Sequence, residues 1–129
     1  MSDSVKTILI VDDEPDVLVY LATLLTDHGF QVLTAESGAR GMELAHTHHP
    51  DLITLDLAMP SESGLRVYCD LLEEPITGNI PVLIVTGVSS EFHHYLDNNP
   101  HLSPPTAFFE KPIDREKFIE TIRNILGDS

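Results

Sequence analysis

The sequence predicts an α/β domain in which helices cover both faces of a parallel sheet. Short apolar runs rich in β-branched residues recur along the 129 residues, and each is followed by an amphipathic stretch. The runs do not alternate with polar residues, which is typical of strands buried on both faces. Since parallel strands need crossover connections, the repeated β-then-α units favour a helix after each strand.

The strands are identified by these apolar runs. The first is TILIV, and the third is DLITL, which stops immediately before Asp56. We expect strands over residues 7–11, 30–35, 51–55, 81–85 and 106–109.

The helices are predicted from apolar residues at helical spacing. Pro15 suits a first helical turn, where its missing N–H costs nothing, and Gly29 is a suitable end for that helix. Asp114 suits the N-cap of the last helix. Residues 88–105 are the irregular stretch, where one helix of about three turns fits over residues 90–98, with a proline-rich loop behind it. The other helices are expected over residues 15–28, 38–48, 65–73 and 115–126.

Composition limits the classes of function. The length fits one domain, over residues 1–129 with a core at about 6–126, and we expect no output domain. The net charge of −14, with only 7 Lys and Arg, disfavours binding to nucleic acid or a membrane surface and favours a cationic ligand. No apolar stretch is long enough for a membrane span. The lone Cys69 excludes an intrachain disulfide, which suits a reducing cytoplasm.

Polar residues gather at the carboxyl ends of the predicted strands, where ligands bind in such sheets. These ends supply Asp12 and Asp13, Asp56, Thr86 and Lys111 in chain order. Clustered carboxylates repel one another, and one lysine does not balance them, so we expect a divalent metal. Oxygen ligands with room for water favour Mg²⁺ (or Mn²⁺) over a caged Ca²⁺.

The same residues predict phosphoryl transfer. A hard metal, a hydroxyl and a lysine around a carboxylate are the parts that this chemistry needs. Asp56 can then act as the nucleophile and form an aspartyl phosphate. No Walker-type glycine loop is present, so the expected donor is another phosphorylated molecule rather than a bound nucleotide.

Four motifs at these strand ends resemble the receiver domain of two-component response regulators. They are ILIVDDEP at residues 8–15, LDLAMPSESG at 55–64, VTG at 85–87 and EKP at 110–112. The resemblance runs from about Lys6 to Leu126. It implies a flavodoxin-like three-layer α/β/α sandwich, with a five-stranded parallel sheet in the order 2-1-3-4-5 and five helices, of which the fourth is irregular here.

The resemblance also implies the chemistry of the acidic site in phosphorelay signal transduction. Asp56 would accept a phosphoryl group from a sensor histidine kinase or a histidine phosphotransfer protein. Asp13, Asp56 and the backbone carbonyl of Ala58 would bind Mg²⁺, and Asp12 would act largely through water. Self-phosphorylation from a donor and slow autodephosphorylation would be its only catalysis, so the protein is not expected to be an enzyme.

A switch pair, Thr86 and Phe108, is implied in the same way. The hydroxyl would move onto the phosphate as the aromatic ring turns inward, while Lys111 pairs with the phosphate and forms a cis peptide with Pro112. Phe109 adjoins Phe108, and one of the two rings is expected to pack in the core. The family signals through the face of the fourth helix, fifth strand and last helix, towards an output protein or by forming a homodimer on phosphorylation; the output here stays open.

Two alternatives remain at this point. A degenerate receiver would serve only as an interaction module, although the intact acids, Thr86 and Lys111 count against it. A metal-dependent phosphatase would normally carry a second acid two residues after its nucleophile, where this chain has Ala58.

Ala58 and Val88 cannot hydrogen-bond water through their side chains, so slow self-dephosphorylation is expected. The 7 histidines show no zinc-site spacing.

Overall fold

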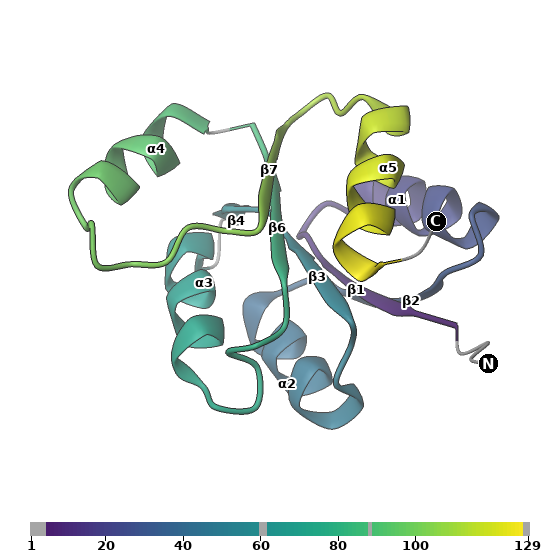
Figure 1. Ribbon diagram of the computed structural model, residues 1–129, viewed down its shortest axis with the longest axis horizontal. Helices are drawn as coiled ribbons and strands as arrows, with labels where there is room; N and C mark the ends of the chain where they lie inside the picture. Colours follow the sequence, from purple (N-terminus) through teal and green to yellow (C-terminus); the bar gives the residue numbers. More distant parts are fainter. Residues whose placement is uncertain (1–4, 60–61, 88, 128–129) are drawn as a thin grey trace.

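A parallel sheet runs through the middle of the computed structural model, which describes residues 5–59, 62–87 and 89–127 (Figure 1). Its strands are β1 (Thr7–Val11), β2 (Gln31–Ala35), β3 (Leu52–Leu55), β6 (Val82–Thr86) and β7 (Ala107–Glu110). They pair in the order β2-β1-β3-β6-β7, and every pairing is parallel. The predicted strand order and the flavodoxin-like architecture are therefore confirmed.

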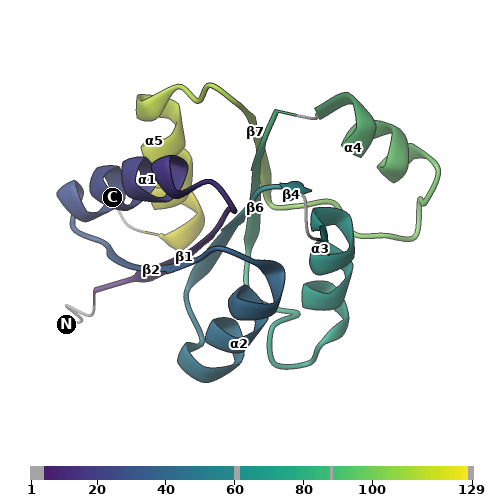
Figure 2. The same cartoon turned by 180° about the vertical axis from the view of Figure 1, so that it is seen from behind.

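Helices form the two outer layers. They are α1 (Pro15–Asp27), α2 (Gly38–His48), α3 (Gly64–Glu73), α4 (Ser89–Asp97) and α5 (Arg115–Leu126). Figures 1 and 2 show α1 and α5 on one face of the sheet and α2 and α3 on the other. None of the described helices is long and apolar enough to cross a bilayer.

Alternate residues of each strand feed two separate hydrophobic cores. In β1, Ile8 and Ile10 join the core under α1 and α5, whereas Leu9 and Val11 join the core under α2 and α3. All four are at most 2% exposed. Because successive side chains leave opposite faces of a strand, a strand between two cores must be apolar at every position. This explains why the predicted strands show no polar alternation.

The ends of α5 agree with the sequence signals. The Asp114 carboxylate accepts hydrogen bonds from the backbone N–H groups of Glu116 and Lys117, and so satisfies two unpaired donors at the start of α5. Gly127 ends the helix with a φ of 74°, a left-handed conformation that glycine adopts without strain.

The segment around α4 differs in detail from the expectation. The helix is regular over Ser89–Asp97, so the predicted irregularity lies behind it, in residues 98–106. Tyr68 of α3 is fully buried, and its hydroxyl donates a hydrogen bond to the backbone carbonyl oxygen of Ser103, with 2.6 Å between the two oxygens. Burial raises the pKa of Tyr68 to about 12, so this hydroxyl remains a donor at neutral pH. The bond fixes the irregular loop against α3.

A small antiparallel hairpin, β4 (Ala58–Met59) with β5 (Glu62–Ser63), follows Asp56 and was not predicted. It returns the chain to Gly64, whose N–H donates to the carbonyl of Leu57 at 3.1 Å. A Cβ at Gly64 would lie 2.3 Å from the Cα of Leu57 and 2.7 Å from the carbonyl oxygen of Asp56. This close approach of the backbone at Gly64 therefore requires glycine. The tight turn from Leu57 to Gly64 also restrains the backbone of Asp56.

We expect Gly64→Ala to destabilise the protein by about 1–3 kcal/mol or more, because backbone atoms cannot move aside as a flexible side chain can. Urea unfolding measures the change. Gly87→Ala is the control, since a Cβ there would meet nothing within 4 Å. Equal unfolding midpoints for the two variants would contradict the tight return.

Candidate functional site

Backbone hydrogen bonds hold the predicted site residues at one edge of the sheet. The N–H of Asp12 donates to the carbonyl of Ala35 at 3.1 Å, and the N–H of Asp56 donates to that of Val11 at 3.0 Å. Both bonds continue the parallel ladders just beyond the ends of β1 and β3. The two aspartates are therefore extensions of buried strands, with little freedom to separate.

The structure brings together the three acids predicted as metal ligands. One carboxylate oxygen from each of Asp12, Asp13 and Asp56 lies within 4.8 Å of the others. Asp12 is 2% and Asp56 is 3% exposed, whereas Asp13 is half-buried. Among the described residues this is the one group of three or more potential metal-ligating side chains at such distances, and it contains no histidine.

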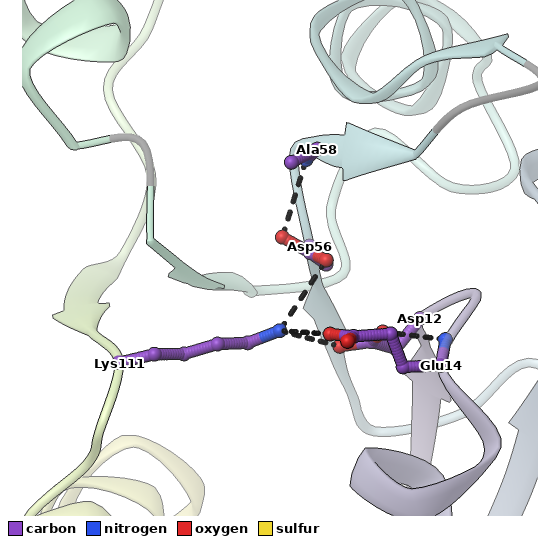
Figure 3. A network of polar contacts seen from close by, with 5 residues as sticks. All are labelled: Asp12, Glu14, Asp56, Ala58 and Lys111. Atoms are coloured by element: carbon purple, nitrogen blue, oxygen red, sulfur yellow. Dashed lines mark hydrogen bonds and ion pairs between the residues drawn. The ribbon is translucent and has the colours of Figure 1, made fainter.

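Lys111 reaches into this cluster from beyond β7 (Figure 3). Its Nζ donates to Asp12 Oδ2 at 3.0 Å and to Asp56 Oδ2 and Glu14 Oε1, each at 3.4 Å. The N–H of Lys111 donates to the carbonyl of Thr86 at 3.0 Å, and the Lys111–Pro112 peptide is cis, as predicted.

Lys111 and Asp12, which form the shortest of the three ion pairs of Lys111, both have altered proton affinities. Burial raises the pKa of Asp12, against the opposing effects of the Glu14 N–H and the Lys111 ammonium. Burial alone would lower the pKa of Lys111, but Asp12 and then Asp56 outweigh it and raise that pKa. The raised pKa of Lys111 thus reflects the carboxylates around its ammonium, whereas the raised pKa of Asp12 reflects first its burial.

The chemistry of this donor set fits a hard divalent cation. When ionised, the carboxylates of Asp12, Asp13 and Asp56 exceed the Lys111 ammonium by two negative charges. All the ligand atoms offered are carboxylate oxygens, and Mg²⁺ combines one or two carboxylates with several waters. Asp12, Asp13 and Asp56 are thus the residues that could hold Mg²⁺ or Mn²⁺.

The remaining predicted residues surround the acids. Ala58 donates its N–H to Asp56 Oδ1 at 3.2 Å, and Thr86 is fully buried at the end of β6. Phe108 faces the core under α2 and α3, where it stacks on Phe92 of α4 with ring centroids 5.5 Å apart. Phe109 faces the opposite core, against Phe118. Val88 lies outside the described residues.

Two contacts at the site were missed by the sequence reasoning. Glu14 appeared only as a letter of a motif, yet its carboxylate contacts Lys111. The ring centroids of His93 and Phe108 lie 4.8 Å apart. Two residues of α4, Phe92 and His93, thus contact the predicted switch residue. The position of Glu14 directly after Asp12 and Asp13 was a usable signal, whereas nothing in the spacing indicated the ring contacts.

Fold and site together define a flavodoxin-like α/β protein with an acidic cluster, which could hold a cation, at the carboxyl edge of its sheet. The sequence matches the response regulator receiver domain over residues 8–123. The chain belongs to this family, whose members interact with histidine kinases and output partners, and its role lies in two-component signalling.

Three relatives illustrate the match. Protein PilH of Pseudomonas aeruginosa is 35% identical over 120 residues, which cover 93% of this chain and 97% of PilH. The polar-differentiation response regulator DivK of Brucella ovis is 32% identical over 124 residues, covering 96% of this chain and 98% of DivK. The structure of the chemotaxis protein CheY4 of Vibrio cholerae superposes with a TM-score of 0.82 at 23% identity, covering 95% and 99% of the two chains, and supports the fold alone.

We expect Asp13→Asn to weaken Mn²⁺ and Mg²⁺ binding by at least about tenfold, because even the loss of an outer-shell partner has that effect. Isothermal titration calorimetry measures the affinity. Asp16→Asn removes the same charge from an exposed side chain in the first turn of α1 and is the control. Equal affinities for the two variants would exclude Asp13 as a ligand.

Proposed function

We propose that this receiver domain accepts a phosphoryl group on Asp56 from a phosphohistidine donor in a Mg²⁺-dependent reaction. The donor is a sensor histidine kinase or a histidine phosphotransfer protein. One observation carries the proposal: the Asp56 carboxylate lies at the end of a buried strand, with the oxygens of two further aspartates within 4.8 Å and the Lys111 ammonium at 3.4 Å. A nucleophile and counter-charges for a transferring phosphoryl group are thus within reach of one point.

In the proposed step, a carboxylate oxygen of Asp56 attacks the phosphorus and forms an O–P bond. The P–N bond to the donor imidazole breaks, and its electron pair remains on that nitrogen, which takes a proton from solvent. The N–H of Ala58 orients the carboxylate through Oδ1, and so limits which oxygen is presented. The product is an acyl phosphate on Asp56, which carries one more negative charge than the free carboxylate.

The surrounding residues divide the task of balancing that charge. The residues that would hold Mg²⁺ are Asp12, Asp13, Asp56 and the backbone carbonyl of Ala58, and the bound metal would supply positive charge to the phosphoryl oxygens. Lys111 transfers part of its hydrogen bonding from the carboxylates to the phosphoryl group. The hydroxyl of Thr86, at the end of the neighbouring strand, donates to another phosphoryl oxygen.

Phosphorylation then favours one of two arrangements of Thr86 and Phe108. The ring contacts of Phe108 with Phe92 and His93 support this part of the proposal, since a rotation of the Phe108 side chain would change its contacts with α4. The face formed by α4, β7 and α5 would therefore differ between the two states. An output protein or a second phosphorylated copy reads this face.

An apolar surface beside the site supports a protein as the donor. Val19 and Tyr20 of α1 are 65% and 45% exposed, although both are large and apolar or aromatic. Tyr20 lines a groove of about 240 Å³ between α1 and the Lys111–Pro112 peptide. Exposed apolar patches commonly mark protein contacts, and this groove is lined by Lys111, which contacts the Asp56 carboxylate.

We expect incubation with Mg²⁺ and acetyl phosphate to add the mass of one phosphoryl group to the protein, and Asp56→Asn to abolish the adduct. The asparagine amide cannot act as the nucleophile but keeps the size of the side chain. Intact mass spectrometry measures the adduct. Asp16→Asn, with the same loss of charge, should label as the wild type does.

The same experiment separates the alternatives. Consumption of acetyl phosphate by the wild type without an accumulating adduct would indicate a phosphatase. Absence of both adduct and consumption, with phosphohistidine proteins as well as acetyl phosphate, would indicate a degenerate interaction module.

The phosphorylated protein should lose its phosphate slowly, over minutes or longer, because neither Ala58 nor Val88 can orient an attacking water. Ala58→Asn provides an amide there and should accelerate the loss roughly fivefold, the effect of one hydrogen bond worth about 1 kcal/mol in the transition state. Phosphate release from purified, donor-free protein measures the rate. Ala39→Asn, at an exposed position in α2, is the control, and loss within seconds in the wild type would contradict the prediction.

A further inference from the structure

Glu14 differs from the other carboxylates on Lys111. An ammonium has three N–H donors, and Asp12, Asp56 and Glu14 provide three acceptors for them. Asp12 and Asp56 are buried and belong to the candidate metal site, whereas the Glu14 side chain is 61% exposed and does not belong to it. Glu14 therefore holds Lys111 from the solvent side of the cluster.

The position of Glu14 in the chain makes this contact notable. Glu14 is the N-cap residue of α1, where a side chain often accepts a hydrogen bond from the first helical turn, yet its carboxylate makes no such bond. Its N–H donates to Asp12 Oδ1 at 2.9 Å, which fixes its backbone beside the cluster. The side chain crosses instead to Lys111, 97 residues away in sequence.

A divalent cation held by Asp12 and Asp56 would draw on the two carboxylates that also bind Lys111. Glu14 lies outside that cluster, so its contact with Lys111 does not depend on those carboxylates. An incoming phosphoryl group must then draw the ammonium away from Glu14 before Lys111 can neutralise its charge. Because the Glu14 carboxylate is largely exposed, water screens its attraction to Lys111, and the restraint is modest.

We propose that Glu14 is a positioning residue that competes with the incoming phosphoryl group for the Lys111 ammonium and so slows phosphorylation of Asp56. This inference rests on the proposed function and adds a restraint on the rate. The contact between Glu14 and Lys111 matters here, and the negative charge of Glu14 alone is not sufficient for the effect.

Three variants separate contact from charge. Glu14→Gln removes the charge and weakens the contact. Glu14→Asp keeps the charge but shortens the side chain by one methylene, and aspartate at an N-cap bonds to the first helical turn instead. Asp16→Asn removes a nearby charge that does not contact Lys111. Each variant is labelled with acetyl phosphate and Mg²⁺, and the adduct is followed by intact mass.

Both Glu14 variants should label faster than the wild type by about two- to fivefold, the range expected for an exposed ion pair, while Asp16→Asn should differ little. In a Lys111→Met background, Glu14→Gln should have no more effect than Asp16→Asn. As a direct readout of the contact, the ¹⁵Nζ signal of Lys111 should shift in both Glu14 variants of the unphosphorylated protein and stay in place in Asp16→Asn.

The outcomes are distinct. If Glu14→Gln and Asp16→Asn accelerate labelling equally, or if Glu14→Asp behaves as the wild type does, only charge matters and the inference is wrong. It is also wrong if either Glu14 variant labels more slowly, or if the effect of Glu14→Gln survives in Lys111→Met. Failure of the wild type to label with any donor would overturn the proposed function, and the inference with it.

Discussion

Repulsion between carboxylates is the constraint on which the site depends. Asp12 and Asp56 are almost fully buried, and their oxygens lie within 4.8 Å of each other and of Asp13. At such distances, and with little water between them, like charges raise each other's free energy by far more than they would at the surface. The Lys111 ammonium compensates for part of this repulsion, at 3.0 Å from Asp12 and 3.4 Å from Asp56. In the proposed function, a divalent cation would balance the remaining negative charge.

The scaffold prevents the acids from relaxing apart. Asp12 and Asp56 extend β1 and β3, which are paired along their length and lie between two hydrophobic cores. Behind Asp56 the chain turns back so tightly at Gly64 that no side chain would fit. Moving the backbone of either aspartate away would thus disturb strand pairing or core packing. The packing of the two cores therefore holds the acidic residues close together.

The sequence predicted those parts of the structure that follow from periodicity and from strand ends. The five strands of the sheet, the cap at Asp114 and the gathering of Asp12, Asp13, Asp56 and Lys111 are of this kind, because burial on two faces and parallel pairing leave few alternatives. The β4–β5 hairpin was missed, since a pair of two-residue strands has no period to detect. The contact of Glu14 with Lys111 was also missed, because a flexible side chain at a helix start can cap the helix or reach elsewhere, and tertiary position decides.

β7 connects the acidic site to α4 and to the irregular loop behind it. Phe108 stands on this strand three residues before Lys111, with its ring against Phe92 and near His93 of α4. Behind α4, the irregular loop is held to α3 through Tyr68 and Ser103. Phe108, which contacts α4, lies on β7, and Lys111, the counter-ion of the acids, directly follows this strand. The loop after α4 is held separately, by its bond to α3. In the proposed switch, a change at Lys111 and Thr86 would consequently reach α4 through the ring of Phe108. The loop after α4 would stay bound to α3, so that α4 would move relative to this loop.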